Sequence, residues 1–300
     1  MVKLVLHGLK LPEVRPGDDL VGLILDSIKS QGLSIDDGDV LVVTTKVVSK
    51  AMGLLCKLEQ ITPSRKAVII GTRAGVDPRF IELLLRECND LIIAIPVYKL
   101  VSEGFINIDA LSKERVKAIE VLRKSPTVFI TVRNGELWSD CGIDTSNHPG
   151  DTYSVPPRDL DEVAKEISNE VLRRVGRRVA VVLCDTELFL TGSIDVARGC
   201  YGLPPTARGF GLEDLYGKPK FGGADALPHE VCAAAALIMG QRDEGVPAVL
   251  IKGLRYEWFD GGLKTLKVID ISKAKKALIE VIKHTLRVLG IKALIRLVMP

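Results

Sequence analysis

The sequence predicts an α/β or α+β fold in which helices pack on mixed sheets. Apolar runs of strand length, such as Val40–Thr44 and Arg178–Asp185, alternate along the chain with segments of helical periodicity such as 159–175. Hydrophobic residues make up 47% of the 300 residues and aromatic ones only 5%, so Val, Ile, Leu and Ala must fill the core. Such a core is typical of a buried sheet covered by helices.

Local signals predict the elements in order. Residues 2–7 alternate as a strand, and Asp18 or Asp19 can cap a helix that runs to about Gln31. Asp77-Pro78 is typical of the first turn of a helix, here ending near Cys88, and Asn134-Gly135 indicates a hairpin. We further expect a strand at 91–95, helices at 111–124 and 159–175, a strand that ends at Asp185-Thr186, a Gly-rich stretch from 192 to 223 without regular structure, a helix ending at Met239, a strand at 247–251 and a helix at 272–289.

Composition argues against several classes of function. The formal net charge is only +3, with acidic and basic residues mixed along the chain, which does not favour nucleic-acid or membrane binding. No apolar stretch reaches the ~20 residues of a membrane span, and no secretory signal is visible, so we expect a soluble cytoplasmic protein. The six cysteines show no CxxC pair and are expected to be reduced and mostly buried, and zinc binding is not expected.

Asp185-Thr186 is the sharpest candidate for a functional site. An aspartate that follows a buried strand points into the crevice where open sheets bind ligands, and a carboxylate beside a hydroxyl suits Mg²⁺ or Mn²⁺. The alternative is that Asp185 only caps the next segment. Cys141–Asn147 places Asp144 among hydroxyl and amide groups, and a solvated Asx-turn is its alternative. If the two loops meet, Asp144 and Asp185 supply the carboxylate pair that a metal–nucleotide site needs.

Three further segments could bind phosphate. Thr44–Lys50 carries Lys46 and Lys50 after a buried strand, although a surface strand with exposed lysines is the more common explanation of such a segment taken alone. The Gly-rich stretch carries Arg198, Arg208, Lys218 and Lys220, but no Walker or Rossmann motif is present, and it can be an irregular connection. Met239–Val246 is a polar loop that could face the same crevice or simply end a helix.

Taken in order, these segments resemble the coenzyme F-420-0:L-glutamate ligase family, also called γ-glutamyl ligase. The resemblance covers about residues 8 to 254 and rests on an ordered set of short motifs: Leu11-Pro-Glu-Val14, Gly17-Asp-Asp-Leu20, Asp39-Val-Leu-Val-Val43, Val48-Ser-Lys-Ala51, Gly142-Ile-Asp-Thr-Ser-Asn147, Cys184-Asp-Thr186, Asp195-Val-Ala197, Asp214-Leu-Tyr-Gly217 and Ala235–Gly240 before Val246-Pro247. It implies a γ-glutamyl ligase-like fold with two intimately associated parts and a homodimer of archaeal type.

The resemblance also implies a reaction and a set of residues. A GTP- and metal-dependent ligase would form an acyl phosphate on the carboxylate of F-420-0 and then a γ-linked amide with L-glutamate. The catalytic residues would be Asp144, Asp185 and Lys50. Metal ligands would be Asp144, Asp185, Thr186 and Gln241. GTP would contact Leu11, Pro12, Glu13, Val14, Thr45, Lys46, Lys50, Asn147, Met239, Gly240, Gln241, Arg242, Asp243, Glu244, Gly245 and Val246.

The sequence departs from the family pattern in places. Glu187-Leu188 follows Asp185-Thr186 where the family has Gly-Arg, and the segment at about 95–135 is longer. We expect a catalytic domain at 1–260, and at 261–300 a strand and a helix that pack on it. Two other functions remain open: a sister ligase with another carboxylate acceptor, and a non-catalytic nucleotide-binding paralogue.

Overall fold

The computed structural model describes residues 3–189, 192–241, 243–266 and 274–291. The chain divides into two compact units, residues 1–266 and 267–300. The second unit contains helix α10 (Ala274–Leu289). Residues 261–266 form turns, and the rest of the region in which we expected a strand before that helix lies outside the described residues.

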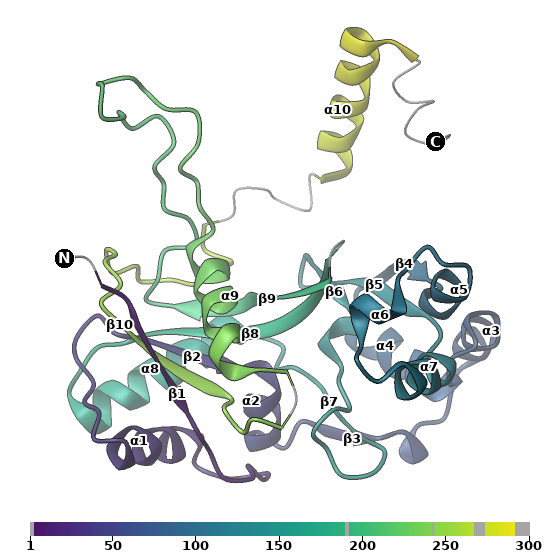
Figure 1. The fold of residues 1–300 in the computed structure, drawn as a ribbon, viewed down its shortest axis with the longest axis horizontal. Helices are drawn as coiled ribbons and strands as arrows, with labels where there is room; N and C mark the ends of the chain where they lie inside the picture. The colour runs from purple at the N-terminus through teal and green to yellow at the C-terminus, as the bar shows by residue number, and fades with distance from the viewer. Residues whose placement is uncertain (1–2, 190–191, 242, 267–273, 292–300) are drawn as a thin grey trace. The chain divides into compact units, whose positions relative to one another are not determined.

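A five-stranded mixed sheet forms the centre of the larger unit (Figure 1). Its order is β1 (Val5–Leu9), β10 (Ala248–Lys252), β2 (Val40–Thr44), β8 (Ala180–Phe189) and β9 (Gly192–Tyr201). Only β2 and β8 are parallel, with Thr44 paired to Cys184. The residues that follow these two positions therefore meet at the same edge of the sheet.

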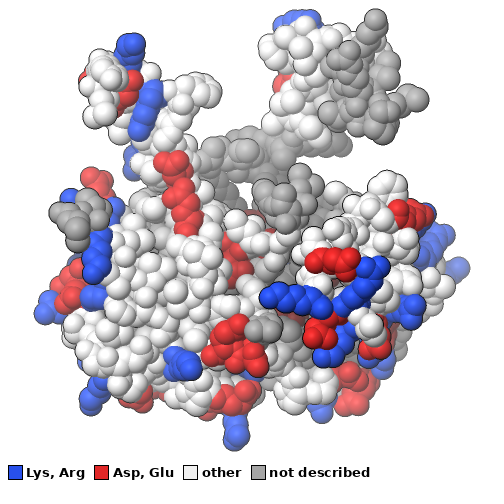
Figure 2. Space-filling model, in the orientation of Figure 1, with Lys and Arg blue, Asp and Glu red and all other residues white. Residues whose placement is uncertain are grey.

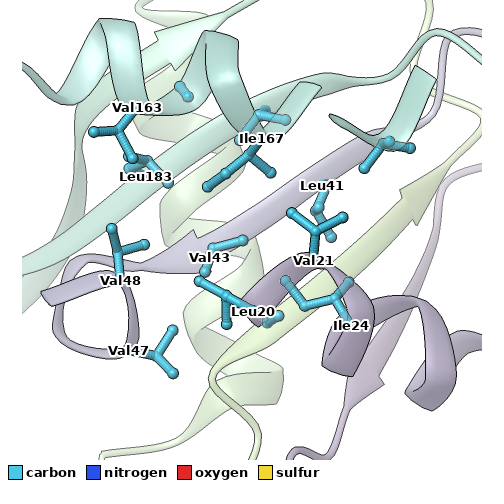
Figure 3. Close-up of a cluster of buried hydrophobic side chains, with 14 of the residues drawn as sticks. Leu20, Val21, Ile24, Leu41, Val43, Val47, Val48, Val163, Ile167 and Leu183 are labelled. Carbon is cyan, nitrogen blue, oxygen red and sulfur yellow. The ribbon is translucent and has the colours of Figure 1, made fainter. Parts of the chain in front are cut away.

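Helices cover both faces of this sheet because β2 and β8 are apolar on both sides. Leu41 and Val43 face the cluster formed with α1 (Leu20–Ser30), α2 (Thr45–Ala51) and α8 (Leu160–Val175) (Figure 3). The alternate residues Val40 and Val42 face the cluster that includes α9 (Leu227–Met239). The period of two along a strand thus divides its side chains between two cores.

A second part of the larger unit is built on the three-stranded sheet β4-β5-β6. Its strands are β4 (Asp90–Ile95), β5 (Val128–Arg133) and β6 (Glu136–Ser139), and its helices are α3 (Arg65–Ala74), α4 (Pro78–Glu87), α5 (Val97–Ser102), α6 (Ile108–Leu111) and α7 (Arg115–Lys124). A separate core cluster supports it. The short strands β3 (Leu55–Lys57) and β7 (Thr152–Ser154) pair beside it. The α+β prediction is confirmed.

The region after Asp185 differs from the sequence prediction. Strand β8 does not end at Asp185-Thr186 but continues to Phe189, and Gly192–Tyr201, expected to be irregular, returns beside it as β9. Antiparallel pairing gives residues 185–189 backbone partners although the apolar run has ended. Lys46 and Lys50 lie in helix α2, so the alternative of a surface strand is wrong. The helix expected at 111–124 is broken at Ser112, whose backbone is extended.

Four of the six cysteines form disulfides, so the expectation of reduced thiols is wrong for them. Cys88 is bonded to Cys141 and Cys184 to Cys232, while Cys56 and Cys200 are free. A sequence pattern indicates only closely spaced cysteine pairs, whereas these pairs are 53 and 48 residues apart and are brought together by the fold. The expected burial is confirmed for most of them, because Cys141, Cys184, Cys200 and Cys232 are 0–1% exposed.

Charged side chains of both signs are interspersed on the visible face of the molecule (Figure 2), as the small net charge leads one to expect. Among the described residues, no helix has the length and apolar character needed to cross a membrane.

Candidate active site

A cavity of about 590 Å³ opens between the two parts of the larger unit. The five-stranded sheet and α2 contribute one wall, and the segment after β6 contributes another. Residues proposed from the sequence that line it are Leu11, Pro12, Glu13, Val14, Thr45, Lys46, Lys50, Asp144, Asn147, Asp185, Thr186, Met239, Gly240, Gln241, Asp243, Glu244, Gly245 and Val246. Arg242 lies outside the described residues. Segments far apart in sequence therefore meet at one place.

Asp185 lies on the sheet wall of this cavity. The parallel pairing of β2 and β8 brings Thr45 beside it, and Thr45 Oγ1 donates a hydrogen bond to Asp185 Oδ2 at 2.8 Å. The backbone N–H of Thr186 donates to the other carboxylate oxygen at 2.9 Å. Burial raises the pKa of Asp185 to about 7, although Thr45 and Arg198 favour the charged form. A cation in the cavity would compensate this poorly solvated charge.

Asp144 is on the opposite wall and has a different environment. Lys46 Nζ lies 2.6 Å from Asp144 Oδ2, and the backbone N–H and Oγ of Ser146 donate at 2.7 and 2.9 Å. Burial acts to raise the pKa of Asp144, but Lys46 and Ser146 outweigh it and hold this pKa below its usual value. The backbone of Asp144 pairs with Ser154, which fixes its position beside β7.

Asp195 is a cavity residue that the sequence reasoning did not include among the site residues. It faces Thr186 across the β8–β9 hairpin, is 5% exposed, and accepts a hydrogen bond from Thr186 Oγ1 at 2.7 Å. Gln241 Nε2 donates to the same oxygen at 3.1 Å. Asp195 thus orients two of the proposed metal ligands. Only the hairpin register, which was not foreseen, places it here.

Lys50 is largely buried and belongs to the same cavity. Its Nζ lies 2.8 Å from Glu13 Oε1, and this hydrogen bond lowers the pKa of Glu13. The backbone N–H of Leu11 donates to the carbonyl of Gly245 at 3.2 Å, so the 11–14 segment and the 239–247 loop are neighbours. Lys46 and Lys50 bring two ammonium groups to the cavity, which suits a polyphosphate.

The donors around the cavity fit a divalent metal. Carboxylates of Asp144 and Asp185, the Thr186 hydroxyl and the Gln241 amide are hard oxygen donors of the kind Mg²⁺ and Mn²⁺ prefer. In the described ranges, no group of three or more His, Cys, Asp or Glu side chains is arranged to hold a metal by itself. In nucleotide enzymes, Mg²⁺ is commonly held by one or two carboxylates together with substrate phosphates.

The chain belongs to the F420-0:Gamma-glutamyl ligase family, whose model matches residues 8–253. The coenzyme F420:L-glutamate ligase of Methanothermobacter thermautotrophicus is 35% identical over 262 residues, which cover 85% of this chain and 92% of the relative. The protein of the same name from Methanopyrus kandleri is 36% identical, covering 86% and 90% of the two chains. The resemblance stated from the motifs is confirmed, and the chain is an enzyme of the amino-acid ligase class.

Asp140 offers a test of the buried electrostatics at this cavity. Burial, aided by Glu187, raises the pKa of Asp140 to about 6, although Phe129 N–H donates to it at 2.8 Å. The pKa of Asp140 is higher in the folded state than in the unfolded state. The ionised carboxylate therefore destabilises the folded protein above about pH 6, whereas below about pH 4 the group is largely protonated in both states and has little effect.

Asp140→Asn should therefore raise the free energy of unfolding by on the order of 2 kcal/mol near pH 8 and change it little near pH 4. Urea unfolding of the metal-free protein at both pH values measures this difference. An equal effect at the two values would show that the charge of Asp140 is not responsible.

Proposed function

We propose that the enzyme joins the amine of L-glutamate to a carboxylate of coenzyme F420-0 through an amide bond, with GTP and Mg²⁺ or Mn²⁺ as co-substrate and cofactor. The observation that carries this proposal is the meeting of Asp144, Asp185, Lys46 and Lys50 around one cavity. The name of these relatives, coenzyme F420:L-glutamate ligase, supports the choice of acceptor and amino acid.

In the proposed reaction, an oxygen of the acceptor carboxylate attacks the γ-phosphorus of GTP and GDP leaves. The glutamate amine then attacks the carbonyl carbon of this acyl phosphate, the amine loses a proton, and inorganic phosphate departs. Lys46 and Lys50 would hold the phosphates as point charges. When bound, the metal would polarise the phosphoryl oxygens and offset their charge.

The site residues supply positioning rather than a covalent nucleophile. Asp144 and Asp185 would hold the metal from two sides, and the 11–14 segment and the 239–246 loop would enclose the guanine nucleotide. Fixed groups of this kind lower the barrier because little reorganisation is needed during reaction.

A product assay tests this function. Protein incubated with GTP, Mn²⁺, L-glutamate and F420-0 should yield an acceptor heavier by one glutamyl residue, and Asp185→Ala should yield none. Absence of product with metal-dependent GTP cleavage would exclude F420-0 as the acceptor. Failure to bind nucleotide would refute the mechanism.

A sister ligase with another acceptor is the second candidate. Glu187-Leu188 stands where the sequence pattern of the family has Gly-Arg, and the Glu187 carboxylate is paired with the buried Arg198. A phosphodiester acceptor such as F420-0 would lack that cationic anchor. The same assay with other carboxylate acceptors distinguishes the two, since a sister ligase cleaves GTP productively only with its own acceptor.

We also propose that the enzyme is a homodimer that pairs through the arm, residues 203–226. The arm leaves β9, projects from the larger unit and returns to α9 (Figure 1). Cross-arm backbone hydrogen bonds such as Ala207 N to Asp225 O hold its two limbs together. Leu215 and Phe221 are 100% and 96% exposed, and Tyr216 is 87% exposed. An ordered apolar projection of this kind is typical of a subunit contact, and a second copy of this chain is the partner we propose.

Leu215→Ser combined with Phe221→Ser should convert the dimer to a monomer, because both side chains would lose a buried environment at the interface. Sedimentation equilibrium measures the change. Val121→Ser is the matched control, since Val121 is 63% exposed on α7 and lies outside the arm. A double variant that remains dimeric, or an unaltered protein that is monomeric, would contradict this interface.

A further inference from the structure

A partly buried carboxylate, Glu187, links the two parts of the larger unit beside the cavity. Its Oε2 accepts hydrogen bonds from the backbone N–H and the Oγ of Ser139 at 2.7 and 2.6 Å. Glu187 follows Asp185 by two residues on β8, and Ser139 precedes Asp144 by five residues at the end of β6. The contact therefore joins the strand that carries one proposed metal ligand to the segment that carries the other.

Arg198, on the neighbouring strand β9, contacts both Glu187 and strand β6. Its Nη2 forms an ion pair with Glu187 Oε1, and its guanidinium stacks on the ring of Trp138 at 4.0 Å from the centroid. Nη1 lies 3.8 Å from Glu136 Oε2. The Arg198 side chain is only 6% exposed and that of Glu187 14%, so both charges depend on each other for compensation. Glu136, Trp138 and Ser139 all belong to β6.

The segment between Ser139 and Asp144 fixes where Asp144 lies relative to strand β6. Asp140, Cys141 and Gly142 all have positive φ, at 44°, 62° and 69°. A Cβ on Gly142 would lie 2.5 Å from the ring of Trp138, so the backbone is packed directly on that side chain. Such a tight turn leaves the backbone little conformational freedom between Ser139 and Asp144.

We propose that Glu187 and Arg198 are positioning residues that set the spacing between the carboxylates of Asp144 and Asp185, and thereby the affinity for the metal–nucleotide complex. The proposal rests on the proposed function of the cavity. Neither Glu187 nor Arg198 is among the described residues that line the cavity, so they act through Ser139 and Asp185 rather than on the ligand. This role goes beyond stabilising the fold, and the two can be separated.

Binding of Mn²⁺ in the presence of GDP, measured by electron paramagnetic resonance, tests the proposal without turnover. Glu187→Gln removes the closer of the two carboxylates that pair with Arg198 and turns a neutral amide toward it, so Mn²⁺ affinity should fall about tenfold or more and the unfolding temperature should drop. Glu187→Gln with Arg198→Met removes the buried charge and keeps an acceptor for Ser139, so both properties should recover.

Glu187→Leu with Arg198→Met separates positioning from stability. It also lacks the Arg198 charge, so its unfolding temperature should lie above that of Glu187→Gln, but it offers Ser139 no acceptor and its Mn²⁺ affinity should stay low. The matched control is Glu170→Gln, which breaks the surface pairs with Arg173 and Arg174 on α8 and should leave Mn²⁺ affinity unchanged.

Two results would overturn the positioning role: Mn²⁺ affinity unchanged in Glu187→Gln, or affinity that recovers in the Leu/Met double variant together with its stability. If the unaltered protein binds no Mn²⁺ with GDP, the proposed function itself fails, and the positioning role fails with it. The unaltered protein thus serves as the reference that distinguishes the two failures.

Discussion

Asp185→Asn should abolish ligation while making the metal-free protein more stable near pH 8. The amide still accepts the hydrogen bond from Thr45, but it offers no charge to a metal, and loss of such a contact lowers turnover by about a thousandfold or more. Burial raises the pKa of Asp185 to about 7, so the ionised group destabilises the folded state above that pH and Asn removes this cost. Steady-state turnover and urea unfolding measure the two effects.

Asp144→Asn is the matched control for this prediction. It should also abolish ligation, but it should lower stability, because Lys46 holds the pKa of Asp144 below its usual value and would lose its partner. If both variants lose activity equally while Asp185→Asn gains stability and Asp144→Asn loses it, the loss of activity is due to metal binding and not to a change in folding. An active Asp185→Asn enzyme would contradict the assignment.

Lys50→Met should weaken GTP binding by about ten- to a hundredfold, since one desolvated charge–phosphate contact is lost. The fold should tolerate the change, because Met fills similar space and the Glu13 side chain, 65% exposed, stays solvated. Calorimetric titration with a non-hydrolysable GTP analogue measures the affinity.

Glu13→Gln provides the comparison, because it frees Lys50 from its ion pair without removing the ammonium group. Its affinity for the analogue should equal or exceed that of the unaltered protein. If Lys50→Met binds the analogue normally, Lys50 pairs only with Glu13 and the phosphates lie elsewhere in the cavity.

The elements that were predicted correctly are those with local signals. Asp19 accepts a hydrogen bond from the first turn of a helix, as its position before an amphipathic run indicates, and Asp77 and Asp159 do the same at the start of the helices expected from 77 and 159. The buried runs at 40–44 and 180–185 form strands because their apolar residues supply two cores at once. Capping and periodicity act over a few residues and can be read directly from the chain.

Long-range pairing could not be predicted in this way. The continuation of β8 past Asp185 depends on its partner β9, and the disulfides depend on contacts about fifty residues apart in the chain. Asp195 and Glu187 acquire their places only through that hairpin. The convergence of Asp144 and Asp185 was conditional on their loops meeting, and the cavity brings them together. Their roles, and those of the nucleotide-contacting loops, stay predictions.

The most direct test of the central claim follows one oxygen atom. F420-0 labelled with ¹⁸O in the carboxylate that becomes the amide is incubated with the enzyme, GTP, Mn²⁺ and L-glutamate, and the released inorganic phosphate is analysed by mass spectrometry. If an acyl phosphate forms at this site, each amide bond made should transfer one ¹⁸O atom to phosphate. Amide formation with unlabelled phosphate would contradict phosphoryl transfer to the acceptor carboxylate.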